Sequence, residues 1–165
     1  MDNYAVINGK HVELTDEQVK AINAEIVELK TNPFNRMGLG SYCYIPHLDG
    51  TVGTFTEDNS TSANYAYRNC SYFNDKDFAK QVALHQLLYR KLLKFAYDNN
   101  CEDIEWNTAN DHWRILYCKN DDDFDVLNMK AVKDLTVYFS TKEGASRAIN
   151  EVIRPFMKEH PDFVW

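Results

Sequence analysis

The sequence has no excess of basic residues: 18 lysines and arginines stand against 25 aspartates and glutamates, a net charge of −7. A protein that binds nucleic-acid backbones generally carries a positive balance, so the composition disfavours that class. The sequence also lacks any run of 18 apolar residues, and we expect no membrane-spanning helix. The length of 165 residues predicts a single α+β domain over 1–165, with a division into modules 1–100 and 101–165 as the alternative.

Closely spaced metal ligands are missing as well. The four cysteines (Cys43, Cys70, Cys101 and Cys118) form no C-x-x-C pair, and none of the five histidines pairs with another His or Cys at ligand spacing. Zinc sites usually draw on such pairs. Residues 1–9 contain too few apolar side chains for a signal peptide. We therefore predict a cytoplasmic protein with four reduced thiols.

Catalytic and phosphate-binding motifs are absent, among them G-x-x-x-x-G-K-[ST], G-x-G-x-x-G, G-x-S-x-G and H-E-x-x-H. Asp121, Asp123 and Asp125 have the spacing of calcium-loop ligands. However, Val126 and Val132 stand where that loop needs a glycine and a glutamate. We predict a protein that is not an enzyme and binds neither a metal ion nor a cofactor.

What the chain does contain is a series of hairpin and helix signals. Asn8-Gly9 between two apolar runs predicts a hairpin of residues 4–7 and 11–14. Thr15 and Gln18 then form a predicted capping box for a helix over 16–30. Asp49-Gly50 predicts a second hairpin, of residues 41–46 and 51–55, followed by a polar loop over 57–69.

The rest of the chain also contains signals for helices and strands. A long helix with a broad apolar face is predicted to end at Asn99-Asn100 and to form the centre of the core. Strands are expected over 112–119, 124–129 and 135–139. A last helix from residue 140 is predicted to be kinked or ended by Pro155.

An internal repeat links residues 71–79 to residues 137–145. Both segments contain Tyr-Phe, a lysine followed by an acidic residue, and an alanine at matching positions. The pattern predicts two similar strand-to-helix modules in which Asn74 and Ser140 cap the helices. The acidic residue three positions later completes a capping box in each. Duplication and convergent capping both explain the pattern, and neither implies chemistry.

The negative charge is concentrated in residues 101–126, whose eight acidic and two basic residues sum to −6. The rest of the chain is nearly neutral. Two solvated loops beside a strand would explain this, and so would a negative surface that meets a basic partner. The candidate binding residues are Glu102, Asp103, Glu105, Asp121, Asp122, Asp123 and Asp125.

A second candidate contact follows the polar loop. Tyr65, Tyr67 and Arg68 are residue types that dominate protein-binding hot spots, and the same types stack on the bases of single strands. Tyr72 and Phe73 follow closely. The alternative is that these aromatic residues belong to the core or cover the edge of a sheet.

Three segments together resemble small uncharacterised proteins of phages and mobile elements in Gram-positive bacteria. They are the Asn-Pro-Phe-x-Arg motif at 32–36, the Tyr-rich hairpin that follows it, and the repeat that ends in Val-Tyr-Phe-Ser-Thr-Lys-Glu-x-Ala at 137–145. No catalytic residues are assigned in that group. The resemblance implies a mobile-element protein in a bacterial host cell, where small acidic proteins often inhibit defence systems, as anti-CRISPR proteins do.

These observations lead to one principal prediction and two alternatives. We predict a non-catalytic inhibitor that covers the basic surface of a host defence nuclease, preferably Cas9 or its guide-RNA complex, with its acidic segment. The first alternative is a single-stranded nucleic-acid-binding protein that uses Arg90, Lys91 and Lys94 with the tyrosines near Arg68. The second is a small-ligand sponge or an oligomeric structural phage protein.

Overall fold

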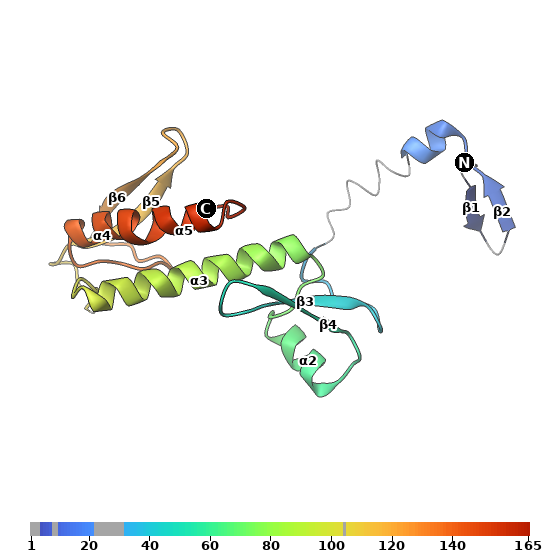
Figure 1. Cartoon of the computed structure of the whole chain (residues 1–165), viewed down its shortest axis with the longest axis horizontal. Helices are drawn as coiled ribbons and strands as arrows, with labels where there is room; N and C mark the ends of the chain where they lie inside the picture. Colours follow the sequence, from blue (N-terminus) through green and yellow to red (C-terminus); the bar gives the residue numbers. More distant parts are fainter. Residues whose placement is uncertain (1–3, 8–9, 22–31, 104) are drawn as a thin grey trace.

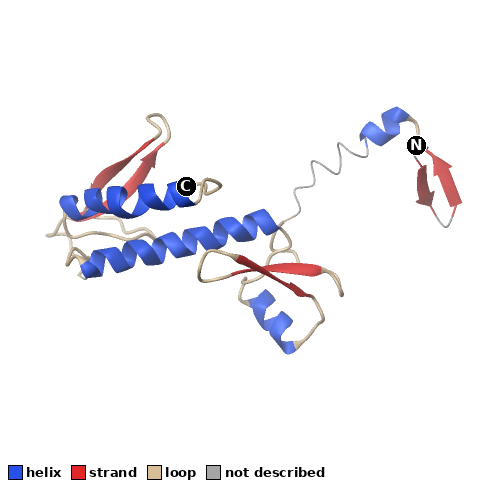
Figure 2. Cartoon of the chain, in the orientation of Figure 1, coloured by secondary structure: helices blue, strands red, loops and turns tan. Residues whose placement is uncertain are grey.

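The computed structural model describes residues 4–7, 10–21, 32–103 and 105–165, which form an α+β fold (Figure 1, Figure 2). Within these residues, three antiparallel hairpins form three separate two-stranded sheets. The predicted combination of hairpins with a long central helix is therefore confirmed. The elements are, in chain order, β1 (Tyr4–Ile7), β2 (Lys10–Glu13), β3 (Tyr42–Pro46), β4 (Val52–Thr56), α2 (Thr61–Arg68), α3 (Lys76–Asp98), β5 (His112–Cys118), β6 (Asp123–Met129), α4 (Lys142–Ala148), the π-helix η1 (Ile149–Ile153) and α5 (Arg154–Glu159).

The first hairpin and its helix cap match the sequence signals. Ile7 of β1 lies opposite Lys10 of β2, so the connection has the two residues that the Asn-Gly signal requires. The Thr15 amide donates to the Gln18 side chain at 2.9 Å, and the Gln18 amide donates to Thr15 Oγ1 at 3.2 Å. This is the predicted capping box. The helix follows over 16–21, and the rest of its predicted length lies outside the described residues.

Helix α3 is the central core element. Its buried face extends from Ala79 near the first turn to Ala96 near the last, and its second half shares a hydrophobic cluster with α4, η1 and α5. In the β3–β4 turn, Gly50 lies against α3: a Cβ there would be 2.9 Å from Leu87 Cδ2 and 3.2 Å from Leu84 Cδ2. The helix ends at Asn99, as predicted, and Asn100 has a positive φ of 50°.

The two strand-to-helix modules are built alike. Phe73 exchanges two backbone hydrogen bonds with Tyr44 of β3, and Phe139 exchanges two with Trp113 of β5. Both phenylalanines are buried, and each is followed two residues later by the N-cap of a helix. The predicted strand over 135–139 is reduced to one bridged residue, because Phe139 alone of that segment forms β-type pairs.

The predicted N-caps were wrong by one residue. Asp75, not Asn74, accepts the Asp77 and Phe78 amides, and Thr141, not Ser140, accepts the Gly144 amide. The Asn74 side chain instead donates to the carbonyls of residues 32 and 35, which ties it to the preceding turn. The acidic residues therefore stand at the second helical position, where they favour the helix dipole but form no capping box.

Two further expectations are corrected. The predicted loop over 57–69 contains helix α2, capped by Ser60, whose Oγ accepts the Ala63 amide at 3.2 Å. Of the two outcomes predicted for Pro155, an end of the last helix is wrong, because the wide turn of η1 directly precedes Pro155 and the chain continues as α5. In the described part of the chain, no helix has the length and apolar character needed to cross a membrane.

Candidate functional site

The acidic residues of 101–126 form two groups at opposite ends of the β5–β6 hairpin. His112 pairs with Met129 at one end of the hairpin, and Cys118 pairs with Asp123 at the other. Six residue steps along β5 correspond to about 20 Å. We call the residues at the turn the acidic tip (Asp121, Asp122, Asp123 and Asp125) and those before β5 the acidic loop (Glu102, Asp103, Glu105 and Asp111).

The acidic tip is exposed at all four aspartates. Asp122 adopts a positive φ of 51° in the turn, and its carboxylate accepts a hydrogen bond from the Tyr117 hydroxyl, which raises the pKa of Tyr117. Asp123 accepts the Phe124 amide and pairs with Arg154 at 2.6 Å, and together these contacts lower the pKa of Asp123. These contacts hold the tip in its turn geometry, and Asp123 already has a cationic neighbour.

Asp103 of the acidic loop belongs to the interior. Its carboxylate lies 2.7 Å from Nδ1 of His112, a fully buried side chain whose Nε2 lies 2.6 Å from the Asn107 carbonyl. Trp106 stacks on the His112 ring with a centroid separation of 4.0 Å. Asp103 thus holds the loop against β5, and it cannot reach a partner in this arrangement.

All four members of the acidic loop, Asp103 included, line an open polar cavity of 450 Å³ together with Asn110 and Ser140. Glu105 is exposed. Glu102 has one buried carboxylate oxygen without a hydrogen-bond partner among the described residues. Asn128 and Lys130 contact the Asp111 carboxylate and lower its pKa. Within the part of the chain that the structure describes, no three His, Cys, Asp or Glu side chains are placed to hold a metal ion.

The candidate aromatic contact at Tyr65, Tyr67 and Arg68 lies on the last turn of α2 and not in a loop. Tyr65 is 71% exposed and Arg68 is exposed. Tyr67 packs against Tyr72 with a centroid separation of 5.6 Å, and the Arg36 guanidinium lies over its ring at 5.3 Å. Tyr72 and Phe73 are core residues and cannot anchor an external contact. In this segment Tyr65, Arg68 and the exposed part of Tyr67 are accessible to a partner.

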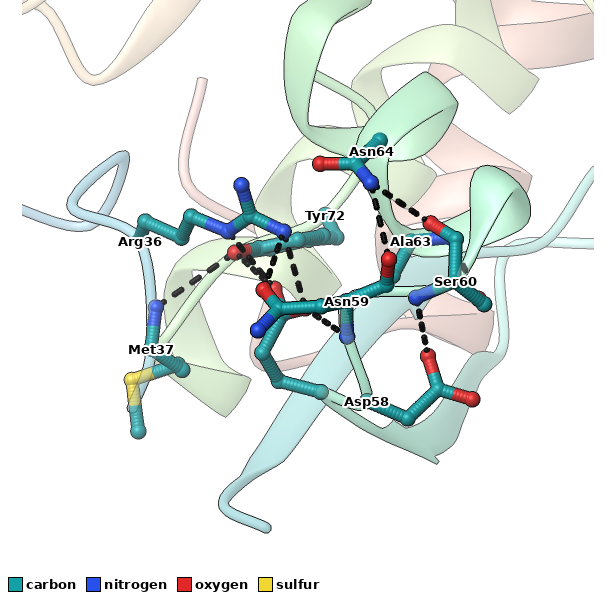
Figure 3. A network of polar contacts seen from close by, with 9 residues as sticks. Arg36, Met37, Asp58, Asn59, Ser60, Ala63, Asn64 and Tyr72 are labelled. Carbon is teal, nitrogen blue, oxygen red and sulfur yellow. Dashed lines mark hydrogen bonds and ion pairs between the residues drawn. The ribbon is translucent and has the colours of Figure 1, made fainter. Parts of the chain in front are cut away.

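A buried carboxylate that sequence reasoning assigned to a loop organises this region. Glu57 is 1% exposed and accepts four hydrogen bonds: two from Arg36 at 3.0 and 3.1 Å, one from the Tyr72 hydroxyl at 2.8 Å and one from the Asn59 amide at 2.9 Å. Figure 3 shows Arg36, Tyr72 and Asn59 converging on this carboxylate. The network joins the 32–37 turn to β4 and to the start of α2.

The ionisation of this network follows from its contacts. The two hydrogen bonds from Arg36 lower the pKa of Glu57 to about 2, although burial opposes the shift. Burial and the bond to Glu57 raise the pKa of Tyr72 to about 12. All four strong acceptor directions of the carboxylate are used, so we interpret the network as a structural clamp and assign it no chemistry. Its signal in the sequence is an acidic residue directly after the alternating strand 52–56.

The chain gives no match to a protein-family model, to a curated protein or to a solved structure. The resemblance to proteins of phages and mobile elements stays a prediction, and function has to be inferred from the geometry of the chain itself.

Proposed function

We propose that this protein is a non-catalytic binding module that presents the acidic tip to a basic surface on a protein partner. The observation that carries the proposal is the position of the four exposed aspartates at the turn end of a hairpin whose two strands have seven residues each. In Figure 1 the turn between β5 and β6 points away from α3 and α4. A surface of this shape can enter a groove that a flat face could not.

The electrostatics support a cationic partner. Four carboxylates within five residues create a negative potential, and Arg154 is the cation that contacts one of them among the described residues. A surface built to bind phosphates offers arginines and lysines, and an arginine accepts a carboxylate as a bidentate partner in the same way as a phosphate. Complementary charges would also accelerate the encounter.

The resemblance described above makes a nuclease of the Cas9 type, loaded with its guide RNA, the first partner to test. By occupying the groove that receives DNA or the surface that reads the PAM, the acidic tip would prevent target binding. The protein would then act as an inhibitor without any catalytic residue. Inhibition would weaken as the salt concentration rises, since exposed charges carry the contact.

The test compares two variants with the same change in net charge. Asp121→Lys/Asp125→Lys removes two tip carboxylates and leaves the Tyr117–Asp122 and Arg154–Asp123 contacts in place. Glu159→Lys/Asp162→Lys changes two exposed acids outside the hairpin. We expect the wild-type chain and the second variant to slow DNA cleavage by the loaded nuclease, and the tip variant to lose this effect.

Two results would count against the proposal at different levels. If the tip variant inhibits cleavage as well as the wild-type chain does, the acidic tip is not the contact. If the wild-type chain neither binds nor slows the nuclease, the nuclease is the wrong partner. Capture of basic nucleic-acid-binding proteins by the wild-type chain, compared with both variants, then decides whether the tip binds any such surface.

A further inference from the structure

A groove of 430 Å³ lies beside the middle of α3, and none of the acidic residues of 101–126 lines it. Its walls come from the middle of α3, from residues 135–137 and from Trp165. The lining is mostly apolar, with Leu88, Leu92 and Val137 at its base and Tyr89 near its opening. The volume falls within the range of pockets that hold small organic ligands.

The rim of this groove carries large apolar side chains that the protein leaves in water. Tyr89 is 47% exposed and Trp165 is 39% exposed, while Leu135 is exposed along its whole side chain. Leaving such side chains uncovered is unfavourable by roughly 25 cal/mol for each Å² of apolar surface. Several of them around one cavity indicate a surface that a ligand covers.

The charge of the lining points to the kind of ligand. Arg90 and His85 line the groove, whereas none of its lining residues is an aspartate or a glutamate. Arg90 Nη2 donates to the Leu48 carbonyl, which orients the guanidinium and occupies one of its five N–H groups. The remaining donors can bind an anion beside an apolar surface.

We propose that this groove binds a small amphiphilic carboxylate. The apolar part of the ligand packs against Leu88, Leu92 and Trp165, and its carboxylate forms a charge-assisted contact with Arg90. None of the four aspartates of the acidic tip lines the groove, although Trp165 packs on Phe124 beside them with a centroid separation of 4.9 Å, and the inference does not use the tip carboxylates. The inference therefore stands or falls separately from the proposed function.

The probe is octanoate, and 1-octanol serves as a probe with the same alkyl chain and no charge. Binding to the full chain is followed by the NMR signal of the Trp165 indole N–H, assigned with Trp165→Phe. We expect octanoate to shift this signal at concentrations at least about tenfold lower than octanol does, the factor that one charge-assisted hydrogen bond provides.

Two pairs of variants locate the site. Arg90→Met is expected to weaken octanoate binding about tenfold and leave octanol unchanged, whereas Lys91→Met removes an equal charge from the neighbouring exposed position and should change neither. Thr136→Phe fills the groove and should abolish binding of both probes. Because Arg90 also contacts Leu48, Arg90→Lys keeps the charge and should restore part of the affinity if Arg90→Met perturbs the fold.

Three outcomes would overturn the proposal. The first is the absence of any shift at Trp165 with octanoate at millimolar concentration. The second is equal binding of octanoate and octanol, which would remove the role of Arg90. The third is unchanged binding in Thr136→Phe, which would place the ligand elsewhere on the chain.

Discussion

Two glycines with the same backbone conformation allow the packing of the β3–β4 turn on α3 to be measured. Gly40 has a φ of 85° and Gly50 a φ of 84°, so an alanine at either position meets the same strain. This strain costs about 1–2 kcal/mol and is partly offset by about 0.4–1 kcal/mol from the loss of freedom in the unfolded chain. The net cost of Gly40→Ala, whose Cβ meets no atom within 4 Å, is therefore about 1 kcal/mol.

Gly50→Ala adds a steric term to the same backbone term. Its Cβ would meet the Cδ2 atoms of Leu87 at 2.9 Å and Leu84 at 3.2 Å. Leu87 can rotate in part, but Leu84 is fully buried and has little room to move. Overpacking of a core by one carbon typically costs about 1–3 kcal/mol, which gives a total of about 2–4 kcal/mol for Gly50→Ala.

Urea denaturation of the two variants and the wild-type chain provides the test. A difference of about 2 kcal/mol between the variants corresponds to a midpoint about 1 M lower for Gly50→Ala, with unchanged slope. Equal midpoints for the two variants would refute the reasoning. They would mean that the β3–β4 turn is not closely packed against Leu84 and Leu87 of α3, and that other contacts hold the hairpin in place.

Two further predictions concern the helix cap and the buried carboxylate. Thr141→Ala should lower the free energy of unfolding by about 1 kcal/mol, because it removes the acceptor of the Gly144 amide. Ser140→Ala should change the free energy of unfolding by less than about 0.5 kcal/mol. Urea denaturation measures both values, and equal effects would contradict the assignment of Thr141 as the N-cap. Glu57, whose pKa is held at about 2, contributes stability that is complete above its ordinary pKa of 4.5 and is lost as the pH falls towards 2. Tyr72→Phe removes the hydroxyl donor to the Glu57 carboxylate, so the loss of stability should begin at a higher pH. Thermal unfolding measured as a function of pH tests this, and an unchanged pH dependence on the acidic side would contradict the role of the Tyr72 hydrogen bond.

The hairpins and α3 could be predicted because their signals are local. The Asn-Gly and Asp-Gly turns fix both the place and the length of two connections, and the apolar spacing of 78–95 admits only one buried helix face. Both signals act within a few residues. They therefore do not depend on which other part of the chain lies nearby.

Helix α2 escaped prediction because it buries only one residue, Ala63. The helix has only eight residues and is polar on average, so its sequence resembles a loop. A signal did exist at its end: Tyr-Ala-Tyr-Arg-Asn at 65–69 parallels Phe-Ala-Tyr-Asp-Asn at 95–99. In both, the asparagine amide bonds four residues back, and the next residue has a φ of 50°.

The N-caps were misplaced for a tertiary reason. Asn74 and Asp75 are both good capping residues, and the local sequence does not separate them. The choice depends on the 32–36 turn, whose carbonyls bind the Asn74 amide and leave Asp75 to cap α3. The clamp around Glu57 depends on the same turn, and its partner Arg36 is 21 residues away in sequence. No local pattern shows that Glu57 pairs with Arg36.

The net charge of residues 101–126, summed along the sequence, does not describe the charge of a single surface. Asp103 is bonded to His112 in the interior, and Asp111 and Asp123 are paired with Lys130 and with Arg154 from a distant helix. The hairpin then separates what remains into two groups about 20 Å apart. A partner of modest size can therefore contact the acidic tip or the acidic loop, and only the tip has its carboxylates exposed at every position. The tip, rather than the whole segment, is consequently the part on which the binding proposal depends.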